Sequence, residues 1–316
     1  MVTNEGISEG MMLQSRRTFL KTTALASAAL AVGSPLGVFA KPAKRLKIGG
    51  FTKELQSLSY EETAEVVSKM GWDGIECPVR SGGHVEPERV EDDLPRMVDA
   101  LRKRDLDLHV IATGIRSLSD PYTERVLRTA GRLGIRYYRM GWWKYNFSRS
   151  IQKQLDDIVP QLKDLAALNA ECGITGIYQN HSGSNYVGAP LWDIYELVSR
   201  VDSDYVGCHF DIGHATVEGG FTWQINYERI KKYIRAVIVK DFKWSYASTR
   251  FGDVEWCPLG DGMIKMEFFK LLKDSDFNGP LTMHFEYHVE GEGRQRIDNW
   301  IMAMTKDAEV LRSWIT

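Results

Sequence analysis

Short apolar runs alternate with amphipathic segments along the chain from residue 46 to the C-terminus. Eight of these runs are nearly continuous in apolar residues, which is typical of strands buried on both faces of a parallel sheet. They lie around residues 46–51, 74–78, 107–113, 136–143, 173–181, 205–214, 236–242 and 281–287. The segments between them carry apolar residues at three- and four-residue spacing, which predicts helices that pack on the sheet.

The helical segments carry signals of their own. The sequence SYEE at residues 59–62 is a capping box, so a helix is expected to begin there and to end at Gly71. The last helix is expected to bury the stripe formed by Trp300, Met304, Ala308 and Leu311. Each apolar run is thus paired with a helix.

Eight strand–helix pairs in one uninterrupted series predict a (β/α)₈ TIM barrel over residues 41–316. Such barrels usually take about 250 residues. The alternative is an open, doubly wound sheet, but no glycine-rich GxGxxG turn follows the first strand. The longest irregular segment is expected at residues 243–263, after the seventh strand, where long loops of a barrel lie over the active site.

The first 40 residues have a different character. The sequence SRRTFLK at residues 15–21 precedes an apolar run of small residues that ends at Ala40. This order is that of a signal peptide, and the paired arginines match the twin-arginine export signal. The run is too short and too weakly apolar for the alternative, a membrane anchor. We therefore expect residues 1–40 to be removed, the twin-arginine machinery to export the chain to the periplasm, and no membrane segment in the mature form.

Charge and cysteine content narrow the classes of partner. The net charge is −2, so no strong field favours nucleic acid or an anionic membrane. The four cysteines, at positions 77, 172, 208 and 257, lack the spacing of a zinc ribbon or a thioredoxin-like motif. We expect no nucleic-acid partner.

Polar residues gather where the expected strands end, which is where the working residues of a TIM barrel lie. Five of the seven histidines fall within the last four strands or just past them. Period-two alternation places His209 with Asp211, and His284 with Glu286, on common faces. The candidates are Glu76, Arg139, Trp142, Trp143, Gln179, His181, His209, Asp211, His214, Lys240, His284, Glu286 and His288.

Six motifs follow one another in order: GIECP, YQNHSG, FDIGHA, VKDF, PLGDG and HFEY. Together they resemble the sugar isomerase and epimerase family with a xylose isomerase-like barrel, and the resemblance extends over residues 46–316. That family holds one divalent metal between a glutamate, an aspartate, a histidine and a glutamate from strands five to eight. The matching positions here are Gln179, Asp211, Ile238 and Glu286.

Two of these four positions depart from the family pattern. Gln179 offers an amide in place of a carboxylate, and Ile238 offers no ligand atom. The resemblance then implies a metal site of Asp211, Glu286 and Gln179, completed by a nearby histidine. Mn²⁺, Zn²⁺ or Mg²⁺ would suit such mixed oxygen and nitrogen ligands.

The resemblance also implies roles for the remaining candidates. The family moves a proton between two glutamates on opposite faces of an enediolate, and an amide at position 179 removes one of the two bases. The catalytic candidates are Glu286, His214, Lys240 and His181. The substrate-binding candidates are Glu76, Arg139, Trp142 and Trp143.

Each assignment has a structural alternative. Asp211 and Glu286 could pair with Lys240 and Arg139 in a network that only stabilises the barrel, and His214 could orient Asp211. Glu76 could pair with a lysine, and the two tryptophans could serve packing alone. His109, in the middle of the third strand, is expected to be a core histidine with satisfied hydrogen bonds.

The expected function is a sugar isomerase or epimerase that acts on a free sugar or keto-sugar through an enediolate. A lyase or hydratase on keto-sugars or glycosides, and a sugar-binding barrel without catalysis, are the alternatives. An apurinic-site endonuclease is disfavoured, because that chemistry needs several zinc ions and a basic face. The sequence leaves open whether the protein forms a homo-oligomer.

Overall fold

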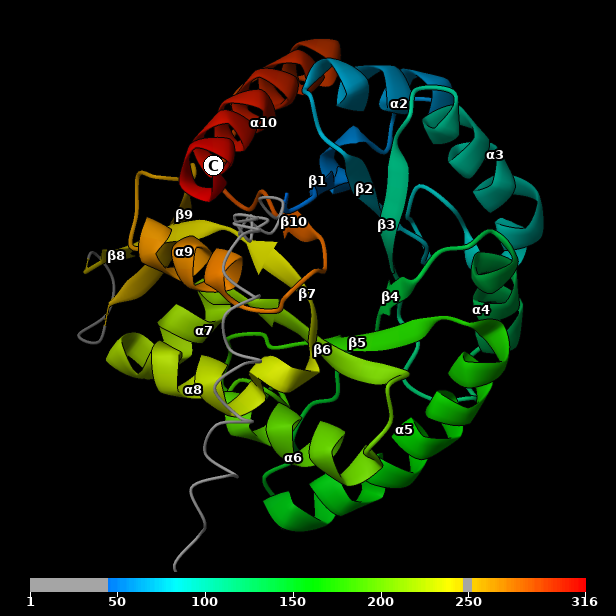
Figure 1. Cartoon of the computed structure of the whole chain (residues 1–316), viewed down its shortest axis with the longest axis vertical. Coiled ribbons are helices and arrows are strands. Elements are labelled where there is room, and N and C mark those ends of the chain that lie inside the picture. The colour runs from blue at the N-terminus through cyan, green and yellow to red at the C-terminus, as the bar shows by residue number, and fades with distance from the viewer. Residues whose placement is uncertain (1–44, 247–251) are drawn as a thin grey trace, which may run out of the picture. The chain divides into compact units, whose positions relative to one another are not determined.

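The predicted TIM barrel is confirmed. The computed structural model describes residues 45–246 and 252–316, so the expected signal peptide lies outside the described residues. Eight parallel strands close into a barrel in the order β1-β10-β7-β6-β5-β4-β3-β2 (Figure 1). They are β1 (Ile48–Phe51), β2 (Gly74–Pro78), β3 (Asp107–Ala112), β4 (Tyr137–Arg139), β5 (Thr175–Gln179), β6 (Val206–Asp211), β7 (Ile234–Val239) and β10 (Leu281–Met283).

Helices cover the outside of the strands, as Figure 1 shows. They are α2 (Tyr60–Lys69), α3 (Val90–Arg102), α4 (Thr123–Arg132), α5 (Ile151–Cys172), α6 (Leu191–Val201), α7 (Ile212–Gly219), α8 (Trp223–Ile230), α9 (Met266–Asp274) and α10 (Gly293–Ile315). The capping box is present at the start of α2, where Ser59 Oγ accepts from the backbone N–H of Glu62 at 3.2 Å. None of these helices is long and apolar enough to cross a membrane.

Two apolar regions hold the barrel together. A large cluster lies between strands and helices and includes the expected stripe of α10, in which Trp300, Met304, Ala308 and Leu311 are all buried. A small cluster of Val110, Ile177 and Ala236 fills the barrel interior. Gln179 lies two residues after Ile177, and Ile238 lies two residues after Ala236. Period-two alternation therefore points both side chains into the barrel.

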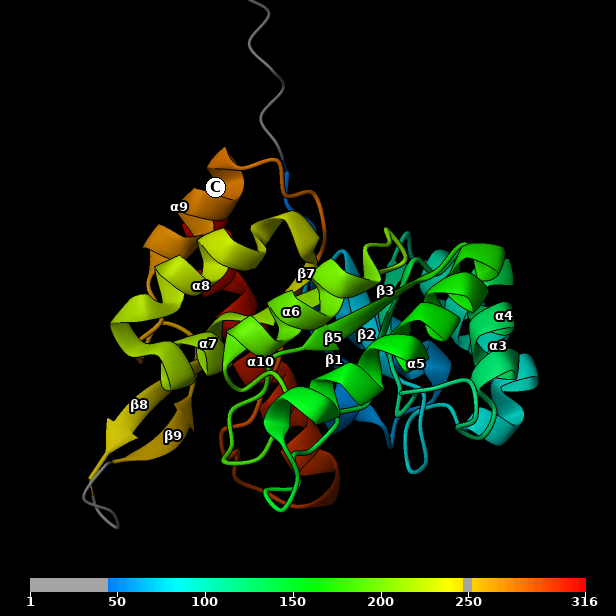
Figure 2. The same ribbon diagram turned by 90° about the horizontal axis from the view of Figure 1, so that it is seen from below.

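The expectation of an irregular segment at residues 243–263 is wrong in part. Strands β8 (Asp241–Ser245) and β9 (Asp253–Cys257) form an antiparallel hairpin there, and Figure 2 shows that it projects away from the barrel. Aromatic residues favour strands and pair across them, and Phe242 lies opposite Trp256 in the register. Helix α7 begins at Ile212, inside the apolar run at residues 205–214 that was expected to form the sixth strand.

Candidate active site

A cavity of about 140 Å³ opens at the carboxyl ends of the strands. This carboxyl-end cavity is lined by Phe51, Lys53, Arg80, Arg139, Trp142, Gln179, His181, His284, Phe285 and Glu286. Its position is the one that active sites occupy in this fold. Sequence reasoning missed Phe51, which ends β1, and Phe285, which follows β10. It also missed Lys53 and Arg80, which follow the first two strands closely in the chain.

Glu76 and Arg139 form a buried ion pair at the cavity floor. Arg139 Nε lies 3.0 Å from Glu76 Oε1, and His284 Nε2 lies 2.9 Å from Glu76 Oε2. Burial would raise the pKa of Glu76, but the neighbouring His284 and Arg139 outweigh it and hold the pKa well below its usual range. Glu76 is fully buried and does not line the cavity. It therefore holds Arg139 and His284 in place, and a direct contact with substrate has no support from its position.

Gln179 connects Arg139 to the next carboxylate. Its Oε1 accepts from Arg139 Nη1 at 2.8 Å, so its amide NH₂ must face the other way. There it donates to Asp211 Oδ2 at 2.8 Å. The guanidinium thus fixes the orientation of the amide, and the amide presents a hydrogen-bond donor to Asp211.

Lys240 lies at the centre of the buried charges. Its Nζ is 2.8 Å from Glu286 Oε1, 3.3 Å from Asp211 Oδ2 and 2.7 Å from His214 Nε2. The contacts with Glu286 and His214 are hydrogen bonds, and Asp211 is an ion-pair partner of the same ammonium group. Asp211 also caps α7, because its Oδ1 accepts from the backbone N–H of His214 at 2.9 Å. The alternative pairing with Lys240 is therefore present, whereas Arg139 pairs with Glu76.

Two histidines lie on the wall next to Lys240. Burial and the charge of Lys240 hold the pKa of His214 well below its usual value, so its ring is neutral. Nε2 accepts from Lys240, which leaves the proton on Nδ1, 2.6 Å from Ser182 Oγ. Burial also lowers the pKa of His181, whose Nδ1 lies 2.8 Å from the carbonyl oxygen of Ser182. Donation to that carbonyl leaves Nε2 of His181 as a hydrogen-bond acceptor.

Glu286 is the carboxylate that faces the carboxyl-end cavity. Its side chain is 34% exposed, whereas those of Asp211 and Lys240 are 0% and 2% exposed and lie behind it. Burial would raise the pKa of Glu286, but Lys240 lowers it on balance. The site therefore presents one ionised carboxylate to a ligand.

The tryptophans have different places. Trp142 lines the cavity under the guanidinium of Arg139, 4.9 Å from the ring centre, and its buried Nε1 has no hydrogen-bond partner among the described residues. Trp143 packs on Tyr178, with ring centres 5.3 Å apart, and does not line the cavity. Adjacent residues in extended chain point to opposite sides, which explains the difference. The alternative that a tryptophan serves packing alone therefore fits Trp143. Trp256, from the β8–β9 hairpin, lies beside Lys240 and is an aromatic residue of the site that the sequence did not reveal.

His209 and His288 lie apart from the cavity. His209 is fully buried in the barrel, its Nε2 is 3.2 Å from Thr282 Oγ1, and burial lowers its pKa to about 3. His288 is 68% exposed and pairs with Glu290. Neither lines the cavity, whereas His181 and His284 do. The histidines along the last strands therefore do not form one cluster.

The positions that the resemblance assigns to a divalent metal do not fit one. Ile238 is buried and apolar, and Gln179 turns its NH₂ group, not its oxygen, toward Asp211. The ammonium of Lys240 lies between Asp211 and Glu286. Within residues 45–246 and 252–316, no group of three or more histidine, cysteine, aspartate or glutamate side chains is arranged to hold a metal ion.

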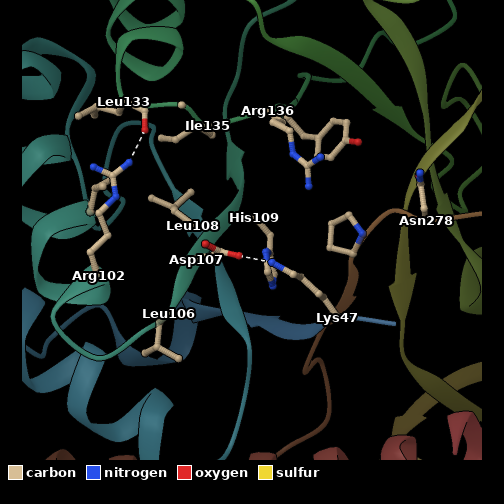
Figure 3. A pocket seen from close by; sticks show the side chains of 14 residues that line it. Lys47, Arg102, Leu106, Asp107, Leu108, His109, Leu133, Ile135, Arg136 and Asn278 are labelled. Carbon is tan, nitrogen blue, oxygen red and sulfur yellow. Dashed lines mark hydrogen bonds and ion pairs between the residues drawn. The ribbon is translucent and has the colours of Figure 1, made fainter. Parts of the chain in front are cut away.

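A second cavity, of about 200 Å³, lies at the opposite end of the barrel (Figure 3). It is lined by residues at the amino ends of the strands, among them Lys47, Asp107, His109 and Arg136. His109 is 7% exposed, and within residues 45–246 and 252–316 its Nε2 has no hydrogen-bond partner, so the expectation of a core histidine with satisfied hydrogen bonds is wrong in that respect. Burial lowers its pKa to about 4, so the ring is neutral. We call this the amino-end cavity.

Comparison with known proteins agrees with the fold. The chain is similar to D-psicose 3-epimerase from Clostridium cellulolyticum H10 (14% identity, 85% of this chain and 99% of that chain, TM-score 0.65). It is similar to 3-keto-D-glucoside 4-epimerase from E. coli (14% identity, 83% and 100%, TM-score 0.63) and to a probable 3-DHS dehydratase from Bacillus anthracis (16%, 84% and 99%, TM-score 0.64).

No curated protein matches the chain. At these identities the solved structures establish the barrel and not the reaction. The family described as xylose isomerase-like TIM barrel matches residues 64–314, which is most of the chain. The protein therefore belongs to the xylose isomerase-like TIM barrel family.

Proposed function

We propose that the protein is an enzyme of the sugar isomerase and epimerase type. It moves a proton at the carbon next to the carbonyl of a free sugar or keto-sugar. The observation that carries this proposal is the ionised carboxylate of Glu286, which faces a cavity beside the neutral ring of His181 and the guanidinium of Arg139. A carboxylate base (Glu286), an imidazole that can accept a proton from a hydroxyl (His181) and a fixed positive charge (Arg139) surround one small cavity, and this set suits an enediolate mechanism.

Each group has a role that follows from its surroundings. Glu286 removes the proton, and the charge of Lys240 behind it keeps the carboxylate ionised. Arg139, held by Glu76, stabilises the negative charge that develops on the enediolate oxygens. The ring of Trp142, which lines the cavity beneath the guanidinium of Arg139, packs against the substrate. His181 Nε2 takes part in proton transfer between the two oxygens.

Gln179 limits the reactions that such a site supports. Epimerisation needs a second base on the opposite face, and the oxygen of Gln179 is already an acceptor for Arg139. Isomerisation and elimination need one base together with a shuttle, which Glu286 and His181 supply. Elimination on a keto-sugar is the second candidate, and the same single carboxylate supports it. We therefore expect little C3-epimerase activity on free ketoses.

The test is a product analysis by NMR. The purified protein is incubated with aldoses, ketoses and 3-keto-glycosides. An isomer formed from at least one of them supports the proposal, and an unsaturated or dehydrated product selects the lyase. Binding of a sugar without any conversion would select the alternative of a non-catalytic barrel.

We also propose that the chain is exported to the periplasm by the twin-arginine machinery. The support is the SRRTFLK sequence followed by the small apolar run. Changing both Arg16 and Arg17 to Lys should leave unprocessed precursor in the cytoplasm. Normal export and cleavage of that double variant would refute the assignment.

A further inference from the structure

The cation of the candidate site is part of the chain itself. The Lys240 side chain is 2% exposed, and its Nζ contacts Asp211, Glu286 and His214. A buried ammonium is unfavourable unless opposite charge and hydrogen-bond acceptors surround it. The buried Asp211 and the cavity-facing Glu286 would, in turn, repel each other without a positive charge between them.

Asp211 and Glu286 are two of the four positions at which the resemblance places metal ligands. We propose that the ammonium of Lys240 takes the place of the divalent cation between them, so that the site works without a metal. The proposal rests on the proposed function only in treating the carboxyl-end cavity as an active site. The position of the ammonium is independent of the substrate.

The neighbouring residues are adapted to an ammonium. The NH₂ group of Gln179 faces Asp211, where a metal would require an oxygen, and Ile238 supplies no nitrogen. A Cβ at Gly213 would lie 2.8 Å from Lys240 Cγ, so glycine at this position leaves room for the lysine stem. Trp256 covers the charge, with its ring centre 4.3 Å from Nζ.

An ammonium group at this position affects catalysis differently from a metal ion. Two of its three donors are used by Glu286 and His214, and the Lys240 side chain is 2% exposed and does not line the cavity, so it cannot also hold two substrate oxygens. Lys240 is therefore a positioning residue that keeps Glu286 ionised and in place. The contacts to substrate oxygens are left to Arg139, which lines the cavity.

The test measures metal binding, which does not depend on knowing the substrate. The full chain is dialysed against Mn²⁺ or Zn²⁺ and then against buffer, and its metal content is determined together with a calorimetric titration. We expect well under 0.1 metal per chain, and any activity found should be unchanged by EDTA. One tightly held metal per chain would overturn the proposal.

Variants make the test specific. Lys240→Ala leaves both carboxylates and opens space, so Mn²⁺ affinity should rise at least tenfold, whereas the similarly long Lys240→Met should gain less. Lys243→Ala, which removes an exposed lysine of the hairpin, is the matched control and should change nothing. Thermal melts check that each variant folds.

A second set of variants keeps the proposal testable if Lys240→Ala does not fold. Gln179→Glu with Ile238→His restores the ligand types that the resemblance implies but retains the ammonium, so it should bind Mn²⁺ little better than the wild type. Adding Lys240→Ala to this pair should produce tight binding. Tight binding by the double variant alone would contradict the proposal. Absence of any sugar conversion would refute the proposed function and leave these results standing.

Discussion

The two ends of the barrel differ in where their charged side chains lie. At the carboxyl end, Glu76, Asp211 and Glu286 are tied to Arg139 and Lys240 by contacts of 2.8 to 3.3 Å inside the protein. At the amino end, Lys47 and Asp107 form a pair in which both side chains are more than half exposed, and the buried His109 is neutral (Figure 3).

This difference shows that burying charge costs free energy at the carboxyl end of the barrel, where a function must explain it. Desolvating several charges is expensive, and buried ion pairs rarely add net stability. Exposed pairs such as Lys47 with Asp107 cost and contribute little. The carboxyl end has two buried carboxylates, Glu76 and Asp211, next to the cavity that Glu286 faces, so we place the chemistry there. Among the described residues, the larger amino-end cavity has no comparable set of buried charges.

The largest effect is expected from breaking the deepest ion pair. Arg139→Met leaves the carboxylate of Glu76 buried with only His284 as a partner. Loss of one member of a buried pair costs about 3 to 5 kcal/mol of unfolding free energy. Urea denaturation measures it. Arg128→Met, which breaks the exposed pairs with Glu124 and Glu171, is the control and should leave the midpoint nearly unchanged. Equal effects of the two changes would show that the carboxyl end is not special.

A smaller effect should come from a buried carboxyl group without a cation. Asp307 accepts from Leu259 N–H at 3.1 Å and from Tyr287 Oη at 2.9 Å, and burial raises its pKa to about 6. Because the folded state binds this proton more tightly than the unfolded state, the stabilisation is complete below about pH 4 and is lost as the pH rises through about 6.

Ionisation of Asp307 is expected to lower the free energy of unfolding by about 3 kcal/mol between pH 4 and pH 7. Glu76 changes the free energy of unfolding in the opposite direction with pH. Its pKa is lowered in the folded state, so its stabilising contribution is lost only in strong acid. The measurement is therefore the difference between wild type and Asp307→Asn in denaturation curves across this range. If the two proteins show the same pH dependence, Asp307 does not titrate as its burial implies.

The smallest effect is expected at the amino end. His109→Gln removes an imidazole whose Nε2 has no hydrogen-bond partner, so activity should stay within about twofold and stability within about 1 kcal/mol. His284→Gln is the matched change at the carboxyl end, where the imidazole contacts Glu76, and it should cost more in both respects. A larger effect of His109→Gln would assign a function to the amino-end cavity.

Much of the fold could be predicted from the sequence, because hydrophobic periodicity depends on local spacing. The eight strands and the capping box at Ser59 and Glu62 lie where expected. The β8–β9 hairpin was missed, although its aromatic residues favour strands and pair across them. Trp142 and Trp143 could not be told apart without knowing which face of the chain turns inward.

The composition of the site could be predicted, but its contacts could not. Glu286, Gln179, His181 and Arg139 all line the cavity, as residues at strand ends should. The position of Lys240 depends on the path of a long side chain past Gly213, and no motif encodes that path. The pairing of Glu76 with Arg139 joins residues 63 positions apart in the chain, which sequence spacing does not reveal.

The most direct test of the account is proton exchange at the substrate carbon. Wild type and Glu286→Gln are incubated in D₂O with the sugar that the product analysis identifies, and NMR follows deuterium incorporation next to the carbonyl. The wild type should exchange this proton, and Glu286→Gln should do so about 10² to 10⁴ times more slowly while melting at the same temperature within a few degrees. Equal exchange rates in the two proteins would contradict the assignment of Glu286 as the base, and with it the claim that the buried charges of the carboxyl end serve catalysis.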